Sequence, residues 1–60
     1  MNLNAELGSV SSSVDLLVER ITEMVSSMNP DDVHPAMNEV ERNLVTASRR
    51  LHRLLRELGA

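Results

Sequence analysis

Residues 29–35 read Asn-Pro-Asp-Asp-Val-His-Pro, and this stretch divides the chain into two halves of similar length. Proline lacks a backbone N–H and disfavours helical geometry in the residue before it. The two prolines therefore end one helix and allow another to begin. Asp32 is a suitable N-cap for the second helix and would place Pro35 in its first turn. Asn29 is the alternative cap, and it would give a short helical turn over 30–34.

On both sides of this turn, apolar residues recur at alternating steps of four and three. The series before the turn is Leu3, Leu7, Val10, Val14, Leu17, Ile21, Met24 and Met28. The series after the turn is Val33, Met37, Val40, Leu44, Ala47, Leu51, Leu54 and Leu58. This heptad pattern is typical of packed helices and does not fit the alternation of a strand. We therefore predict one all-α domain over 1–60, an antiparallel two-helix hairpin with helices over about 3–28 and 34–58 joined by a turn at 29–34.

The weakest part of the helical pattern is the stretch 8–13, which reads Gly-Ser-Val-Ser-Ser-Ser. Glycine and serine have low helix propensity. Ser12 or Ser13 could instead be an N-cap, with residues 1–11 frayed. Because the heptad spacing continues through this stretch without a skip, we favour a helix that starts near residue 3.

The length of 60 residues limits the stability of a single hairpin. Chains below roughly 70–80 residues usually need disulfides, a metal or association, and this chain has no cysteine and no aromatic residue. Val18, Val25 and Leu55 widen the apolar stripes beyond the seam of two helices. We expect copies of the hairpin to associate, either as a four-helix bundle or as a larger ring. The expected oligomer core comprises Leu7, Val10, Val14, Leu17, Ile21, Met24, Met37, Val40, Leu44, Ala47, Leu51, Leu54 and Leu58.

The net charge of −3 is distributed unevenly along the chain. Residues 1–41 contain eight acidic residues and one arginine, whereas residues 42–60 contain five arginines and one glutamate. All of the basic residues are arginine. Arginine presents paired donors that match phosphate, so a basic face on the second helix is a candidate phosphate-binding surface. Its residues are Arg42, Arg49, Arg50, Arg53 and Arg56.

A structural role for the arginines is the competing interpretation. Cations near the end of a helix complement its dipole, and in an antiparallel bundle they could pair with Glu6, Asp15 or Glu19. His34, beside the turn, is a further candidate for ligand contact or pH sensing, although such residues more often fill a turn. His52 lies among the arginines, where a solvated surface position is the simpler interpretation.

Catalysis has no visible set of residues in this sequence. No residue is spaced to activate a serine of the 11–13 cluster, and two histidines without cysteine do not make a metal site. We therefore predict a protein that is not an enzyme and that uses no metal or cofactor. No apolar run reaches the ~18 residues of a membrane helix and no signal-peptide pattern is present, so we expect a cytoplasmic protein without a membrane contact.

A His-Pro turn followed by an arginine-rich second helix resembles the phage counter-defence "sponge" proteins. The resemblance covers about residues 14–58 and rests on His34-Pro35 and on the run Glu41-Arg42-Asn43-Leu44-Val45-Thr46-Ala47-Ser48-Arg49-Arg50-Leu51. Sponge proteins are helical-hairpin oligomers that sequester cyclic oligonucleotide signals at subunit interfaces. The resemblance implies that arginines of different subunits converge on phosphates, with Asn43 or Thr46 as polar contacts.

Two other functions stay open at this point. The hairpin could be a regulatory module that recognises a partner protein through its acidic or basic face. In size and form it also resembles the plasmid copy-number RNA-binding bundles, which implies duplex nucleic-acid binding. A net negative charge is unfavourable for such binding. We therefore expect a homo-oligomeric binding protein, with sequestration of a small anionic ligand as the first hypothesis.

Overall fold

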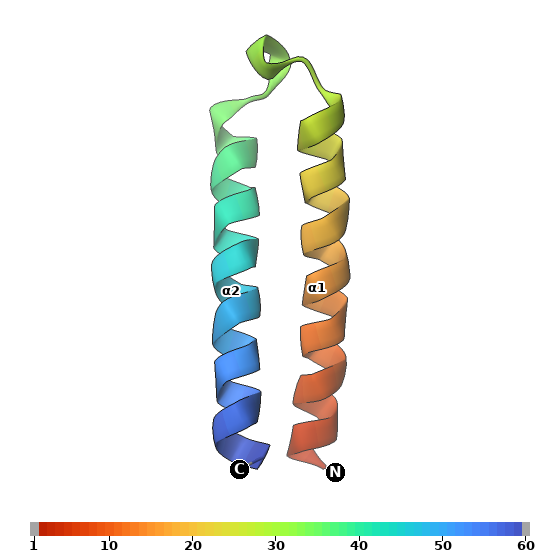
Figure 1. Ribbon diagram of the computed structural model, residues 1–60, viewed down its shortest axis with the longest axis vertical. Helices are drawn as coiled ribbons and strands as arrows, with labels where there is room; N and C mark the ends of the chain where they lie inside the picture. Colours follow the sequence, from red (N-terminus) through yellow and green to blue (C-terminus); the bar gives the residue numbers. More distant parts are fainter. Residues whose placement is uncertain (1, 60) are drawn as a thin grey trace.

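The computed structural model describes residues 2–59, which form two long helices joined by a short turn (Figure 1). The elements are α1 (Leu3–Ser27), a 3₁₀ helix η1 (Pro30–Asp32) and α2 (Pro35–Gly59). The two long helices run antiparallel, so both chain ends lie at the end of the hairpin opposite the turn. The hairpin measures 44 × 15 × 14 Å. The prediction of an all-helical hairpin is confirmed, and the helix limits lie within one residue of the expected ones.

Helix α1 is continuous through the Gly- and Ser-rich stretch 8–13. It begins at an N-cap, Asn2, whose side-chain oxygen accepts a hydrogen bond from the backbone N–H of Ala5 at 3.2 Å. This cap satisfies one of the N–H groups that a helix start leaves without a partner. The alternative of a cap at Ser12 or Ser13 is therefore wrong. The unbroken heptad spacing predicted the helix better than local propensity did.

The turn is stabilised by two side-chain caps. Asn29 Oδ1 accepts a hydrogen bond from the Asp31 N–H at 3.1 Å and begins η1, as the alternative interpretation of the turn predicted. Pro35 is the first residue of α2, and His34 directly precedes it. The Nδ1 atom of His34 accepts a hydrogen bond from the Ala36 N–H at 3.0 Å. The cap of α2 is therefore His34 and not Asp32, which is part of η1.

The helices meet along a central column on each helix and along one flank beside it. The central column consists of half-buried residues seven apart, namely Leu7, Val14 and Ile21 on α1, Met28 directly after it, and Met37, Leu44 and Leu51 on α2. Residues four positions further along are also buried or half-buried: Ser11, Val18 and Val25 on α1, and Glu41, Ser48 and Leu55 on α2. In an antiparallel pair, positions with the same heptad offset lie on the same side. We call this side the closed flank.

The opposite side of the pair, which we call the open flank, is apolar and uncovered. Its residues lie three positions after the central column, namely Leu3, Val10, Leu17 and Met24 on α1 and Val40, Ala47 and Leu54 on α2. All but Ala47 are exposed, and Leu3, Met24 and Leu17 keep 59%, 54% and 47% of their surface. Several residues of the expected oligomer core therefore remain outside the contact between the two helices.

The hairpin has no fully buried apolar core among residues 2–59. Its accessible surface is 4790 Å² for a mass of 6.7 kDa. A compact monomer of this mass is expected to expose about 3,900 Å². The excess of about 900 Å² is comparable to the roughly 800 Å² that each partner buries in a stable interface.

Ser11 is the one fully buried residue in the described part of the chain, and it lies on the closed flank with 3% exposure. Its hydroxyl has no hydrogen-bond partner within residues 2–59. A buried hydroxyl without a partner destabilises a fold by about 1–3 kcal/mol. We therefore expect Ser11→Ala to raise the free energy of unfolding, as measured by urea denaturation.

The control for this prediction is Ser12→Ala, one residue further along the same helix and exposed. Both substitutions gain the same helix propensity. Ser11→Ala should exceed the control by about 1 kcal/mol. Equal gains for the two variants would contradict a cost from the buried hydroxyl.

Candidate functional site

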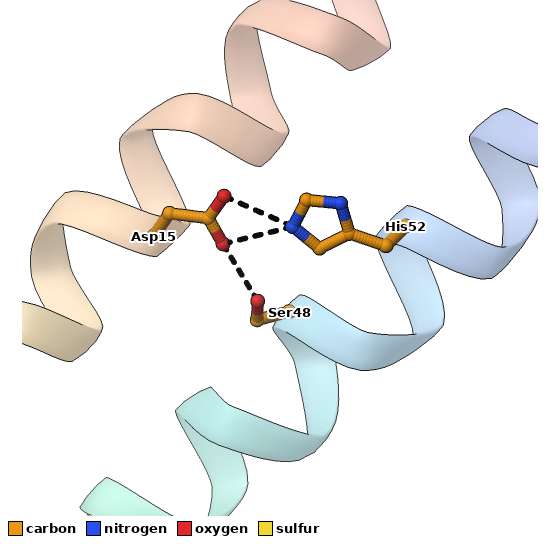
Figure 2. Close-up of polar contacts among 3 residues, drawn as sticks. All are labelled: Asp15, Ser48 and His52. Carbon is orange, nitrogen blue, oxygen red and sulfur yellow. Dashed lines mark hydrogen bonds and ion pairs between the residues drawn. The ribbon is translucent and has the colours of Figure 1, made fainter.

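Three polar side chains connect the two helices at the middle of the hairpin (Figure 2). Asp15 on α1 accepts a hydrogen bond from the Ser48 hydroxyl of α2, with 2.6 Å between Oγ and Oδ1. His52, one turn after Ser48, places its Nε2 atom 2.9 Å and 3.2 Å from the two carboxylate oxygens. We call this group the interhelix clasp. It lies on the closed flank and fixes the register of the helices.

The clasp favours the ionised form of Asp15. The hydrogen bond from Ser48 is the main cause that holds the pKa of Asp15 below its ordinary value of 3.8, and partial burial opposes this effect. The hydrogen bond and the positive charge of His52 lower the pKa of Asp15 further. His52 and Asp15 form an ion pair when the imidazole is protonated, although their side chains stay 55% and 42% exposed.

The clasp contains a serine, a histidine and an aspartate, but in an order that does not activate the serine. In a catalytic triad the histidine stands between the two other residues and accepts the proton of the serine. Here the Ser48 hydroxyl donates a hydrogen bond to the Asp15 carboxylate, and Nε2 of His52 also faces Asp15. Both contacts stabilise the carboxylate. The arrangement can join helices, and it lacks the serine–histidine contact that nucleophilic catalysis requires.

Four of the candidate arginines lie on the outer side of α2, away from α1. Arg42, Arg49 and Arg56 follow one another at heptad spacing, and Arg53 lies beside them. All four are exposed. Arg49, Arg53 and Arg56 surround a shallow depression together with His52. We call these four arginines the arginine surface.

The arginine surface has no acidic partner in the described structure. Among residues 2–59, the only acid–base pair within 4.0 Å is that of Asp15 with His52. Within one hairpin, Glu6, Asp15 and Glu19 make no ion pair with an arginine of residues 2–59, and Asp15 contacts Ser48 and His52 instead. Pairing of these acids with arginines of another subunit stays a prediction. The guanidinium groups remain available to an anion or to a second subunit.

The remaining candidate residues fall into two places. Asn43, Thr46 and Arg50 line a shallow depression with Ala47, Leu51 and Leu54, at the border between the arginine surface and the open flank. His34 lies eight residues before Arg42, or about 12 Å along the helix axis. The structure therefore brings Asn43, Thr46 and Arg50 together and leaves His34 apart, where it caps α2.

Within residues 2–59, no group of three or more acidic or histidine side chains is placed to hold a metal ion. Neither helix of this range has an apolar segment long enough to cross a bilayer. No protein-family model matches the chain, and no curated protein or solved structure shows significant similarity to it. The assignment of function therefore depends on the surfaces described above.

Sequence reasoning missed the clasp, although one signal for it was present. Ser48 and His52 are four residues apart, so they lie on one face of α2, and Ser48 belongs to the heptad row that closes against α1. Asp15 directly follows Val14 of the central column. A comparison of the polar residues beside the heptad seam of one helix with those that face them on the antiparallel helix could have identified the group.

Asp15→Asn should lower the melting temperature near neutral pH, because it removes the carboxylate that both partners contact. The pKa of Asp15 is lowered in the folded state, so its contribution is present above the ordinary value of 3.8 and is lost as pH falls through the lowered folded value. The difference between wild type and variant should therefore shrink in acid. Circular dichroism melts over a pH series measure this.

Glu19→Gln is the matched control, because Glu19 is exposed on α1 and has no polar partner within residues 2–59. It should leave the melting temperature near the wild-type value at neutral pH. A loss of stability in Asp15→Asn that persisted unchanged in acid would show that the carboxylate charge does not stabilise the hairpin.

Proposed function

We propose that this protein is a non-enzymatic homo-oligomer that binds a small phosphate-bearing ligand through the arginines of α2. The observation that carries the self-association is the uncovered open flank, together with the lack of a buried apolar core in residues 2–59. Ordering a chain of this size requires more apolar burial than one pair of helices provides. Association of hairpins through their open flanks covers the exposed leucines, valines and methionine.

The arginine surface supports the ligand part of the proposal. Arginines that lack acidic partners bind phosphate with two parallel hydrogen bonds each. The depression of Arg49, His52, Arg53 and Arg56 groups several such donors over two turns of one helix. A small ligand with two or more phosphates can contact several of these arginines at once. A cyclic oligonucleotide, as in the sponge proteins that the sequence resembles, has this chemistry.

The self-association is tested by Leu17→Glu, which places a charge on the open flank. Full burial of a leucine contributes about 1.5–3 kcal/mol, and 47% of Leu17 is still exposed in the hairpin, so the loss from two subunits should weaken the oligomer about tenfold or more. Helicity at micromolar concentration should fall as well. Sedimentation velocity and circular dichroism measure both effects.

Leu16→Glu is the control, because Leu16 is 61% exposed but lies on the outer side of α1 rather than on the open flank. It should leave the mass of the assembly unchanged. Equal effects of the two neighbouring substitutions would contradict association through the open flank.

Arg49→Ala and Arg53→Ala test the ligand-binding surface. Each removes charged hydrogen bonds worth about 1.5–3 kcal/mol and should weaken binding of a cyclic dinucleotide by about tenfold or more. Isothermal titration calorimetry measures the affinity, and native mass spectrometry checks that the oligomer stays intact. Arg49→Lys keeps the charge without the paired donors and should fall between wild type and Arg49→Ala.

Dissociation of the assembly by these substitutions would show that the arginines are structural. Adenosine, which has no phosphate, should not bind. Binding of a short duplex RNA with a steep loss of affinity in salt, in place of the cyclic dinucleotide, would favour a nucleic-acid-binding function over ligand sequestration.

A further inference from the structure

Beside the open flank, each helix carries a further row of residues seven apart, which are polar at every position but one. On α1 this row lies three positions after Leu3, Val10, Leu17 and Met24 and consists of Glu6, Ser13, Arg20 and Ser27. The equivalent positions on α2 are Ala36, Asn43, Arg50 and Glu57. All eight residues are exposed. Because residues four apart are neighbours on a helix surface, these rows will face the corresponding rows of any hairpin that docks on the open flank.

The contacts of the interhelix clasp show which residues of the two helices lie at the same level along the length of the hairpin. Arg50 lies between Ser48 and His52 in sequence, and both of these contact Asp15, so Arg50 is level with Asp15. Asp15 is also the middle residue of α1. With a rise of about 1.5 Å per residue, Glu6 lies about 13 Å from this level toward the chain ends, and Arg20 lies about 7 Å toward the turn.

A two-fold axis can bring two open flanks together in two ways. In the same-end arrangement, both turns lie at one end and α1 packs on α2 of the second copy. Glu57 lies seven residues after Arg50, about 10 Å toward the chain ends, so this arrangement places Glu6 opposite Glu57 of the second copy. Two acids then face each other on both sides of the dimer, which is unfavourable.

In the opposite-end arrangement, the turns lie at opposite ends and α1 packs on α1 of the second copy. The overlap of the two copies is greatest when the two-fold axis passes at the level of Asp15. Measured along the length of the hairpin, Glu6 then lies within about 6 Å of Arg20 in the second copy. Long side chains span this offset, and the pair occurs twice. Asn43 and Glu57 of the two copies also come level. One unfavourable contact, between the two Arg50 side chains near the axis, opposes these four favourable ones.

We infer that a second copy of this chain docks on the open flank with its turn at the opposite end, held in register by Glu6–Arg20 ion pairs between subunits. This inference rests on the proposed self-association and names its geometry. The apolar columns provide the stability of the interface, and the charges at its border select between two arrangements that bury the same apolar residues.

The distance between the two turns tests the inference directly. The chain has no cysteine, so Asp31→Cys in the exposed η1 turn carries a single spin label. Pulsed electron resonance on the full-length protein should give a distance near the 44 Å length of the hairpin. The same-end arrangement would instead give turns about 10 Å apart at the backbone, the separation of packed helices.

A short distance would overturn the orientation and leave the proposed oligomer standing. A monomeric mass without an intermolecular signal would overturn both the orientation and the proposed self-association. Sedimentation of the labelled protein at the same concentration separates these two outcomes.

Charge reversal provides a second test. Glu6→Arg and Arg20→Glu should each raise the dimer dissociation constant several-fold, and the double variant should recover most of the wild-type affinity. Glu6 also lies in the first turn of α1, and the loss of its helix-dipole effect is the same in the single and double variants. Glu19→Arg, away from the open flank, should leave the constant unchanged. A double variant as weak as the sum of the single variants would contradict the ion pair.

Discussion

The packing of this hairpin depends on one constraint: the apolar stripe on each helix is wider than the surface that one neighbouring helix can cover. Each helix has an apolar central column and an apolar open flank, and further apolar residues on the closed flank, namely Val18 and Val25 on α1 and Leu55 on α2. Two helices cover the central column and the closed flank, and they leave the open flank in water. As a result, no apolar side chain of residues 2–59 is fully buried. The proposed oligomer follows from this geometric limit, because a third and a fourth helix are needed to cover the remaining side.

The interhelix clasp gives the two flanks their different roles. Asp15, Ser48 and His52 satisfy one another on the closed flank, where a docked hydrophobic surface would have to desolvate a carboxylate. The open flank has no such group among its apolar columns. The polar contacts therefore have two consequences: they set the register of α1 against α2, and they leave one face suited to a second copy. The arginine surface lies on the outer side of α2, clear of both flanks.

The hairpin could be predicted from the sequence because its signals are local and repeated. Heptad spacing and a two-proline turn each depend on neighbouring residues, and they agree. The choice of the packed flank could not be predicted in this way, because the four-three spacing ran through Val10 and Leu17, whereas the helices close on the side of Ser11 and Val18. That choice is made by contacts between residues more than thirty positions apart, Asp15 with Ser48 and His52. The cap of α2 was misassigned because aspartate is a more common N-cap than histidine, and Nδ1 of His34 performs the same function.

The central claim is that folding and self-association of this chain are coupled. Sedimentation equilibrium and circular dichroism on the same samples, diluted from high micromolar to nanomolar concentration, test it most directly. Coupling predicts that mean helicity falls together with the average mass as the oligomer dissociates. A fully helical monomer that keeps its helicity at every concentration would contradict the claim.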